Sequence, residues 1–367
     1  MIAAAGPAAG RPVDAATTAL AQQVRTAAAE GRSLRIRGGD SKAFYGAATA
    51  SDTELDTRLL CGILDYEPSE LVLTARAGTP LVEIEQALAE RGQMLGFEPP
   101  RFSSATTLGG VVAAGLSGPA RPFRGSARDF VLGVELVNGH GEVLRFGGQV
   151  MKNVAGYDVS RLQCGALGTL GVLTRVSLRV VPRPAREATL SWPAERAEAA
   201  ARMVALQAKP WPTTGLAHVG NRLYQRVSGS AAAIDDAVRR LAPERVEETG
   251  GPWDDLRDHA PGVLGDAAAG RVAWRLALPP AAPDPDGYAC TVVDWGGALR
   301  WVAAAAGDGA ALASFAARHG GHAQAFRGAV EAHFATPPPA LAALMQRVKQ
   351  AFDPARVFNP GRLYPWL

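Results

Sequence analysis

The chain has 367 residues, which is long enough for two domains with buried cores. Its residues are 47% hydrophobic and 20% charged, as in an ordinary globular protein. The net charge is only +3, and the sequence contains no block of lysines and arginines, so nucleic acid is a poor candidate partner.

The first twenty residues are apolar, but they lack the positively charged start of a signal peptide and are interrupted by glycines and prolines. No stretch approaches the roughly 20 apolar residues that a membrane span needs. Cys61, Cys164 and Cys290 are far apart, so they predict neither a disulfide framework nor an iron–sulfur or zinc site. We therefore expect a cytoplasmic chain with reduced thiols, whose contact with the inner membrane would be peripheral and made through partner subunits.

The first part of the chain predicts short strands mixed with helices. Residues 14–30 form a helical pattern, with Asp14 as the N-cap and Gly31 as the stop. A second helix is predicted over residues 80–92, from a proline to a glycine. Strands are predicted at 34–37, 59–64, 71–75, 131–137 and 142–146, the last two forming a hairpin around the sequence NGHG, with a further alternating strand before 181.

The composition changes after VPRPAR, where alanine, arginine and tryptophan become more frequent. Helical runs are predicted at 194–207, 230–241 and 308–318, and strand-like runs at 216–227, 271–278 and 288–294. Proline-rich segments at 279–285 and 336–339 indicate exposed connections. We predict an α+β protein with a first domain over residues 1–185, a smaller α+β domain with an antiparallel sheet over 186–345, and a C-terminal segment, 346–367, that returns to the first domain.

Four runs of small residues in the first part point to a ligand. They are GGDSK at 38–42, ATTLGG at 105–110, AAGLSG at 113–118 and GTLGVLT at 168–174. Glycine lets the main chain approach a ligand closely, and oriented backbone amides bind phosphate. The alternative is that these glycines serve turns and tight strand contacts. Because four such loops occur in one domain, a long ligand of dinucleotide shape is the better interpretation.

A series of longer motifs carries a family resemblance. The motifs are RGGDSKAFYG, TARAGTPLVEIEQALAERGQMLGFEPP, TTLGGVVAAGLSGP, RGSARDFVLG, GGQVMKNVAGYDVSRLQCGALGTLGVLT and DPARVFNPGR. The series resembles flavoproteins of the vanillyl-alcohol oxidase type, whose FAD domain is called PCMH-type. More narrowly, it is similar to the FAD-binding subunits of bacterial glycolate oxidases, from about residue 33 to the C-terminal end.

The resemblance implies which positions bind FAD. Loop 38–42 would lie under the pyrophosphate, and the later glycine runs would line the rest of the cofactor channel. The residues so implied are Arg37, Gly38, Gly39, Asp40, Ser41, Lys42, Pro99, Thr106, Thr107, Leu108, Gly109, Gly110, Ala114, Gly115, Ser117, Gly118, Ser126, Asp129, Lys152, Gly171, Val172, Leu173, Asn359 and Arg362.

A flavin that accepts hydride develops negative charge near N1 and O2, which a cation would stabilise. Lys152 and Arg362 are the candidates, with a solvated surface charge as the alternative for each. Tyr157 and Asp158 could brace the loop, or serve a purely structural contact. Relatives with covalent FAD often carry histidine directly after the two glycines of the first loop. Asp40 stands there in this chain, which predicts noncovalent FAD, although Cys164 stays open as a point of attachment.

Oxidation of a small 2-hydroxy acid needs a carboxylate clamp, usually arginine, and a base, usually histidine. His319, His322 and Arg327 are weak catalytic candidates, with a packing role as the alternative, and no metal site is expected. The histidine cluster of the related catalytic subunits has no match in this chain, and neither do cysteine ligands for an iron–sulfur cluster.

Three functions stay open at this stage. The first is an FAD-binding subunit of a multi-subunit glycolate oxidase that forms glyoxylate, supporting assembly and electron transfer beside a catalytic flavin subunit and an iron–sulfur subunit. The second is a self-sufficient FAD-dependent 2-hydroxy acid dehydrogenase. The third is a structural subunit without FAD. The intact glycine loops argue against the third function, and the missing histidines argue against the second.

Overall fold

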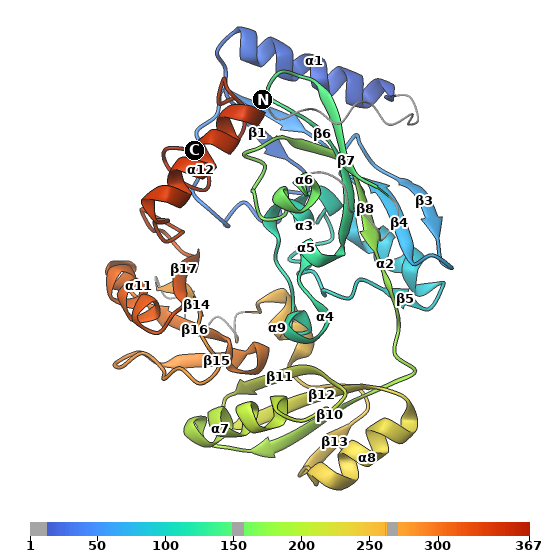
Figure 1. Ribbon diagram of the computed structural model, residues 1–367, viewed down its shortest axis with the longest axis vertical. Coiled ribbons are helices and arrows are strands. Elements are labelled where there is room, and N and C mark those ends of the chain that lie inside the picture. Colours follow the sequence, from blue (N-terminus) through green and yellow to red (C-terminus); the bar gives the residue numbers. More distant parts are fainter. Residues whose placement is uncertain (1–12, 149–157, 261, 263–270) are drawn as a thin grey trace.

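The computed structural model describes residues 13–148, 158–260, 262 and 271–367. Figure 1 shows two parts stacked along the long axis, each built on its own sheet, with helix α12 (Pro339–Phe352) beside the upper part. Both main sheets are antiparallel and both carry helices, which confirms the expected α+β class.

The upper part contains a five-stranded sheet in the order β3-β4-β8-β6-β7 and a small parallel pair, β1-β2. Its strands are β1 (Leu34–Arg37), β2 (Thr53–Asp56), β3 (Ile63–Glu67), β4 (Val72–Arg76), β5 (Gln93–Met94), β6 (Val131–Val137), β7 (Val143–Gly147), β8 (Val172–Arg179) and β9 (Val181–Pro182). Its helices are α1 (Ala15–Ala29), α2 (Leu81–Ala89), α3 (Leu108–Ala114), α4 (Arg121–Arg124), α5 (Ala127–Phe130) and α6 (Val159–Leu162).

Strand β8 lies at the centre of this sheet and supplies side chains to two cores. Leu173, Val176 and Leu178 join the core that contains the apolar side chains of α2 and α3. Val172 joins a second core with the apolar face of α1. Val172 and Leu173 are consecutive apolar residues because they face different cores, whereas polar and apolar residues alternate from Arg175 to Arg179, as the sequence predicts.

The lower part is an eight-stranded sheet in the order β13-β10-β12-β11-β15-β16-β14-β17. Its strands are β10 (Arg186–Pro193), β11 (Thr213–Val219), β12 (Arg222–Gly229), β13 (Arg245–Glu247), β14 (Val272–Ala277), β15 (Cys290–Asp294), β16 (Leu299–Ala304) and β17 (His322–Arg327). Its helices are α7 (Arg196–Gln207), α8 (Ala231–Leu241), α9 (Trp253–Asp258) and α11 (Gly309–Arg318), with single 3₁₀ turns η2 (Trp295–Gly297) and η3 (Ala306–Asp308).

The structure confirms most of the long periodic elements and corrects some short ones. Helix α1 has Asp14 as its N-cap, which accepts a hydrogen bond from the backbone N–H of Thr17 at 3.0 Å. The strand predicted over 59–64 is wrong over most of its length, because β2 ends before it and β3 begins only at Ile63. The single run predicted over 216–227 is two strands, β11 and β12, because Gly220 turns the chain with a φ of 61°.

The two parts meet along a seam that is both polar and aromatic. The guanidinium of Arg226 in β12 pairs with the carboxylate of Glu98 at 2.6 Å, and both side chains are nearly buried. The indole N–H of Trp295 donates to the carbonyl of Gly118 at 3.1 Å. A shared core contains Tyr45 from the upper part and Phe326 from the lower part. These contacts hold the lower sheet against the loops of the upper part.

The C-terminal segment returns to the upper part after helix α12. Phe358 forms a parallel bridge with Leu34 of β1. The Lys349 ammonium is buried and donates to the carboxylate of Asp353 at 2.7 Å and to the carbonyl of Thr169 at 2.7 Å. Asp353 in turn accepts hydrogen bonds from two backbone N–H groups that follow it. This buried network fixes the segment beside the loop that precedes β8.

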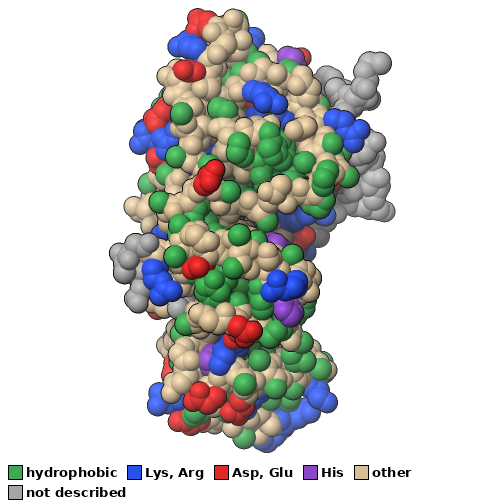
Figure 2. All heavy atoms as spheres, turned by 90° about the vertical axis from the view of Figure 1, so that its left-hand side faces the viewer, with side chains coloured by type: hydrophobic (Ala, Val, Ile, Leu, Met, Phe, Trp, Pro, Cys, Tyr) green, Lys and Arg blue, Asp and Glu red, His purple; other side chains and the backbone are tan. Residues whose placement is uncertain are grey.

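The face shown in Figure 2 carries acidic and basic side chains interspersed among hydrophobic ones, without a large field of one sign. This agrees with the small net charge of the sequence. In the part of the chain that the structure describes, no helix combines the length and the apolar character that crossing a membrane would need.

Candidate functional site

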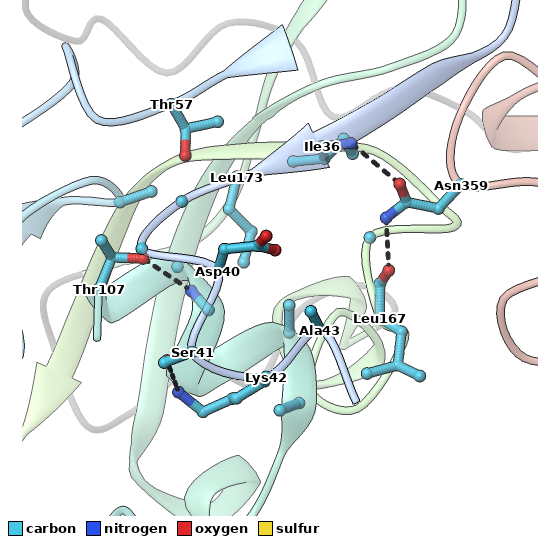
Figure 3. Close-up of a pocket in the computed structure, with 18 of the residues that line it drawn as sticks. Ile36, Asp40, Ser41, Lys42, Ala43, Thr57, Thr107, Leu167, Leu173 and Asn359 are labelled. Atoms are coloured by element: carbon cyan, nitrogen blue, oxygen red, sulfur yellow. Dashed lines mark hydrogen bonds between the residues drawn. The ribbon is translucent and has the colours of Figure 1, made fainter. Parts of the chain in front are cut away.

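A cavity opens in the upper part where four segments far apart in the sequence meet (Figure 3). Loop 38–43 follows β1, helix α3 begins after Thr107, loop 167–171 precedes β8, and Asn359 and Arg362 come from the C-terminal segment. The empty space is about 820 Å³, counted to the open solvent at its mouth. Long ligands with several polar groups occupy sites of this kind, where backbone from several loops converges.

The glycines of loop 38–42 bring this loop close to the chain before α3. A Cβ on Gly39 would lie 1.5 Å from the carbonyl oxygen of Ala105, and a Cβ on Gly38 would lie 2.5 Å from Oγ1 of Thr107. The loop therefore needs both glycines to pack on its own neighbours. Gly110 differs, because a Cβ there would meet only Oγ1 of Thr107, at 3.3 Å, and Gly110 lines the cavity.

Two cations line the cavity without an acidic partner among the described residues. The Lys42 side chain is 8% exposed, and its ammonium donates only to Oγ of Ser41 at 3.3 Å. Burial lowers the pKa of Lys42 to about 8. The Arg362 guanidinium donates to the carbonyls of Lys42 and Tyr45, and burial lowers its pKa as well. A bound anion would offset the cost of burying these charges.

Asp40 lies beside these cations but belongs to a network of its own. It has a left-handed backbone with a φ of 56°, and its carboxylate accepts two hydrogen bonds from Arg35, at 2.6 and 2.7 Å. Arg35 also pairs with Glu54, and Arg37 pairs with Glu54 at 2.9 Å. Figure 3 shows the Asp40 side chain at the open centre of the cavity. The network neutralises a carboxylate that would otherwise repel a phosphate.

Asn359 ties three segments together at the cavity wall, as Figure 3 shows. Its side-chain oxygen accepts from the backbone N–H of Ile36 at 2.9 Å, and its amide nitrogen donates to the carbonyl of Leu167 at 2.7 Å. Gln163 makes a different contribution. Its side chain is 2% exposed, and its amide nitrogen finds no hydrogen-bond partner among the described residues, although Gln163 lines the cavity. A buried donor without an acceptor is what a missing ligand would leave.

The structure brings about half of the expected cofactor residues to this cavity. Those that line it are Gly38, Gly39, Asp40, Ser41, Lys42, Thr107, Gly109, Gly110, Ala114, Gly171, Leu173, Asn359 and Arg362. Two more lining residues, Ala113 and Gly168, belong to the runs 113–118 and 168–174, and those that were not expected from the sequence are Ile36, Ala43, Thr57, Ala77, Gln163 and Leu167. Gln163 and Leu167 fall within the long quoted motif that ends in the fourth run of small residues, and this motif is the signal that could have identified them.

Other expected residues do not line the cavity and instead hold its loops. Leu108 and Val172 are fully buried in apolar cores, and Gly115 caps α3 with a φ of 64°. Thr106 donates to Oγ of Ser41 at 2.8 Å. Arg37 pairs with Glu54, and Ser117 accepts a hydrogen bond from the N–H of Ala127. Ser126 and Asp129 together cap helix α5. Pro99 and Gly118 are buried on either side of the segment that contains α3.

Some expected residues fall elsewhere. Lys152 and Tyr157 lie outside the described residues, and Asp158 caps helix α6 through the N–H of Arg161. Burial raises the pKa of the Cys164 thiol to about 12, so it has little thiolate character. His319 packs against Phe315 at the end of α11 with its ring tilted by 46°, and His322 is exposed at the start of β17. Arg327 lines a separate cavity together with His259.

Comparison with known proteins identifies the domains. A family described as "FAD binding domain" matches residues 15–147, and one described as "FAD linked oxidases, C-terminal domain" matches residues 334–363. Glycolate oxidase subunit GlcE of Escherichia coli (strain K12) is 44% identical over 352 residues, which cover 94% of this chain and 97% of that protein.

More distant relatives share parts of the chain or the fold alone. Glycolate oxidase subunit GlcD of Bacillus subtilis (strain 168) is 35% identical over 156 residues, which cover 41% of this chain and 33% of that protein. The solved structure of an alkyldihydroxyacetonephosphate synthase aligns with a TM-score of 0.66 at 14% identity, covering 93% of this chain and 74% of that one. The latter likeness concerns the fold only.

The described residues fit FAD. Loop 38–43 presents backbone with few side chains, Lys42 and Arg362 supply positive charge for a diphosphate, and Gln163 has an unused donor. The match of the GlcE sequence extends over nearly the whole of both proteins. The chain is therefore an FAD-linked oxidoreductase subunit and belongs to the family of glycolate oxidase subunit GlcE.

Proposed function

We propose that this chain is the FAD-binding subunit of a multi-subunit oxidase that converts glycolate, a small 2-hydroxy acid, to glyoxylate. The single observation that carries the proposal is the cavity around loop 38–43, where glycine loops and two cations without acidic partners meet an unused amide donor. The 44% identity with GlcE along nearly the whole of both proteins supports the substrate and the assembly.

The lining of the cavity suggests how the cofactor would lie. Loop 38–42 would carry the diphosphate on its backbone N–H groups, with Lys42 as the nearest cation. Asn359 would hold the wall between Ile36 and Leu167, and Arg362 would place its charge at the other side of loop 42–45. Bound FAD supplies a hydride acceptor, and the residues of this chain supply its binding, its orientation and compensation of its charge.

The chemistry of Asp40 supports noncovalent binding. Its carboxylate lacks the ring nitrogen through which histidine attaches to a flavin, and Arg35 holds it in an ion pair. Cys164 offers no better attachment point, because burial raises the pKa of its thiol to about 12 and keeps it protonated near neutral pH. We expect that acid precipitation of the protein would leave all of the flavin in the supernatant.

Assembly with other subunits is part of the proposal. The names of the related GlcE and GlcD proteins indicate a glycolate oxidase made of several subunits. We infer that one partner is a catalytic flavin subunit and another an iron–sulfur subunit that receives the electrons, because this chain has three cysteines and an iron–sulfur cluster takes four thiolates. In this arrangement the complex works in the cytoplasm, and any contact with the inner membrane is made by the partners.

The test starts with the chain purified alone and in its assembled complex. The isolated chain should show the visible spectrum of an oxidised flavin, and anaerobic glycolate should bleach the complex but leave the isolated chain yellow. Bleaching of the isolated chain would instead establish a self-sufficient dehydrogenase. A colourless chain that takes up no FAD would overturn the proposal.

A matched pair of variants tests the cavity itself. Gly110→Leu places a side chain in the cavity, next to Oγ1 of Thr107, and should abolish retention of FAD. Gly307→Leu adds the same side chain where no atom lies within 4 Å, and should keep FAD. Gly39 is a poorer choice, because a side chain there collides with Ala105 whether or not FAD is bound. Equal FAD content in both variants would contradict the assignment.

A further inference from the structure

A second cavity lies on the seam between the two parts of the molecule, next to the FAD cavity. Its lining comes from loop 41–44, from Phe102, from residues 258–260 that follow helix α9, and from Arg327 at the end of β17. Its empty space is about 660 Å³, counted to open solvent. Ser41 lines both cavities, so the same short loop separates them.

The walls of this second cavity are largely aromatic. The rings of Phe44 and Phe102 meet edge to face with centroids 5.2 Å apart, and His259 stacks on Phe102 at 5.6 Å. Behind them, Phe326 packs against both Phe44 and His259. These rings are rigid and apolar, so they exclude water and lower the local dielectric constant. An electrostatic interaction in this cavity is therefore stronger than it would be in water.

Two cations stand over these rings without an acidic partner among the described residues. The Arg327 guanidinium lies 4.2 Å from the ring centre of Phe44, and it makes no hydrogen bond or ion pair to a described residue. Its pKa is lowered by burial alone. The Lys42 ammonium lies 5.6 Å from the ring centre of Phe102 and reaches Oγ of Ser41. Both positive groups therefore flank the same pair of rings.

His259 provides the observation that points to a ligand. Its side chain is 6% exposed, its backbone is held in the left-handed region with a φ of 52°, and Nδ1 has no hydrogen-bond partner among the described residues. Burial, with nearby arginines, lowers the pKa of His259 to about 3, so the imidazole is neutral. A buried ring nitrogen of this kind costs stability unless a partner arrives.

The one acidic side chain in the lining, Asp258, already has partners within the protein. The carboxylate of Asp258 pairs with Arg257 and accepts the backbone N–H of Arg101 at 2.9 Å. Burial opposes ionisation of Asp258, but these partners outweigh it and lower its pKa. The charge that the cavity presents to a small molecule is therefore positive.

We propose that the second cavity binds a small carboxylate anion, with Arg327 and Ser41 as hydrogen-bond donors and Nδ1–H of His259 as a third. A guanidinium fork matches the two oxygens of a carboxylate, and ring edges favour negative charge. A short organic acid fits the aromatic walls better than a phosphate, which carries more charge and no apolar part. The proposal concerns binding of a carboxylate by residues of this chain, so it does not depend on whether the chain oxidises a substrate by itself.

The experiment is a calorimetric titration of the FAD-loaded chain at pH 7 with glycolate, glyoxylate and inorganic phosphate as separate probes. The flavin spectrum and thermal unfolding are measured first, so that a loss of FAD, which would concern the proposed function, is distinguished from a loss of anion binding. If the chain is colourless, the same titration is run on the apo protein, and the variants report on the second cavity alone.

Four variants decide the outcome. Arg327→Gln should weaken carboxylate binding by about tenfold or more, because a charge-assisted hydrogen bond is lost, and Arg327→Lys should weaken it less. His259→Asn keeps a residue that tolerates the left-handed backbone and should weaken binding several-fold. Arg318→Gln removes an equal charge from the end of α11 and should change nothing.

Three results would overturn the inference. They are binding to Arg327→Gln as tight as to the unmodified chain, absence of carboxylate binding to the unmodified chain, and phosphate binding tighter than that of both carboxylates.

Discussion

The buried ion pair between Lys349 and Asp353 leads to the most demanding test of the structure. Asp353 is fully buried and Lys349 is 2% exposed. One carboxylate oxygen accepts the backbone N–H of Val357 at 2.9 Å, and the other accepts both the Lys349 ammonium at 2.7 Å and the N–H of Phe358 at 2.9 Å. Asp353→Asn keeps the size of the side chain but turns one of these acceptors into a donor.

The expected cost follows from those contacts. Removing one partner of a buried ion pair costs about 3–5 kcal/mol, because the other charge is left without compensation. In Asp353→Asn the new amide N–H₂ would face the Lys349 ammonium and the N–H of Phe358 in one orientation, or the N–H of Val357 in the other, and each donor that it faces would lose its acceptor. At about 2–4 °C per kcal/mol for a domain of this size, the melting temperature should fall by roughly 10 °C.

The measurement is thermal and urea unfolding of the chain, followed by flavin fluorescence in parallel. Lys349 also donates to the carbonyl of Thr169, in the loop beside the FAD cavity, so flavin release should occur at lower temperature in the variant. Arg347→Met removes an exposed cation from the same helix and should change the free energy of unfolding by no more than about 0.5 kcal/mol.

A double variant separates charge from packing. Lys349→Met combined with Asp353→Asn removes the uncompensated ammonium and should recover part of the stability lost in Asp353→Asn alone. A loss below about 1 kcal/mol in the single variant would refute the reasoning, since it would mean that the pair is hydrated or absent in solution. A double variant less stable than either single variant would refute it too.

Three other predictions concern the cofactor cavity and the seam. Gln163→Leu should weaken FAD binding without destabilising the apo chain, because it removes a buried donor that has no described partner, and FAD titration with apo thermal unfolding measures both. With the pKa of Lys42 near 8, the affinity for FAD should be constant below pH 8 and fall above it as the ammonium loses its proton. The apo chain should become more stable to unfolding above pH 8, because lysine in the unfolded chain still holds its proton there. Lys42→Met should remove both pH dependences in equilibrium titrations. Arg226→Met should lower the free energy of unfolding by about 3 kcal/mol, because it leaves the carboxylate of Glu98 buried without its ion-pair partner. A double-mutant cycle with Glu98→Gln should show an interaction energy between the two residues, and additive effects would contradict a direct pair.

The elements that the sequence predicts well are those determined by neighbours along the chain. Helices α7, α8 and α11 have clear helical periods, and the β6–β7 hairpin has a turn with glycines at fixed places. Strands β16 and β17 were not predicted: both are short, all six residues of β16 are buried and so give no alternation, and β17 pairs with β14, from which it is separated in sequence by two other strands. The segment 59–64, wrongly predicted as a strand, contains apolar residues but forms a turn. Leu60 is buried in this turn, and its carbonyl lies beside Gly78.

In the candidate site too, residues in local sequence motifs could be predicted, whereas residues placed by contacts between distant segments could not. The glycine loops are local signals, so Gly109, Gly110 and Gly171 could be predicted to line the cavity. Gln163 lies inside the long motif that carries the family resemblance, but the motif does not show that its amide nitrogen is buried without a described partner. Asn359 was expected at the cavity only from the family resemblance, and its contact with Ile36, 323 positions away, was not predicted.

The C-terminal segment has a consequence for the order of events in the cell. Loop 38–43 leaves the ribosome long before Asn359 and Arg362, which complete the same cavity. Between them the ribosome must produce the whole eight-stranded sheet. The proposed cofactor cavity therefore closes only once synthesis has passed Arg362, so a nascent chain halted before that point would hold FAD poorly.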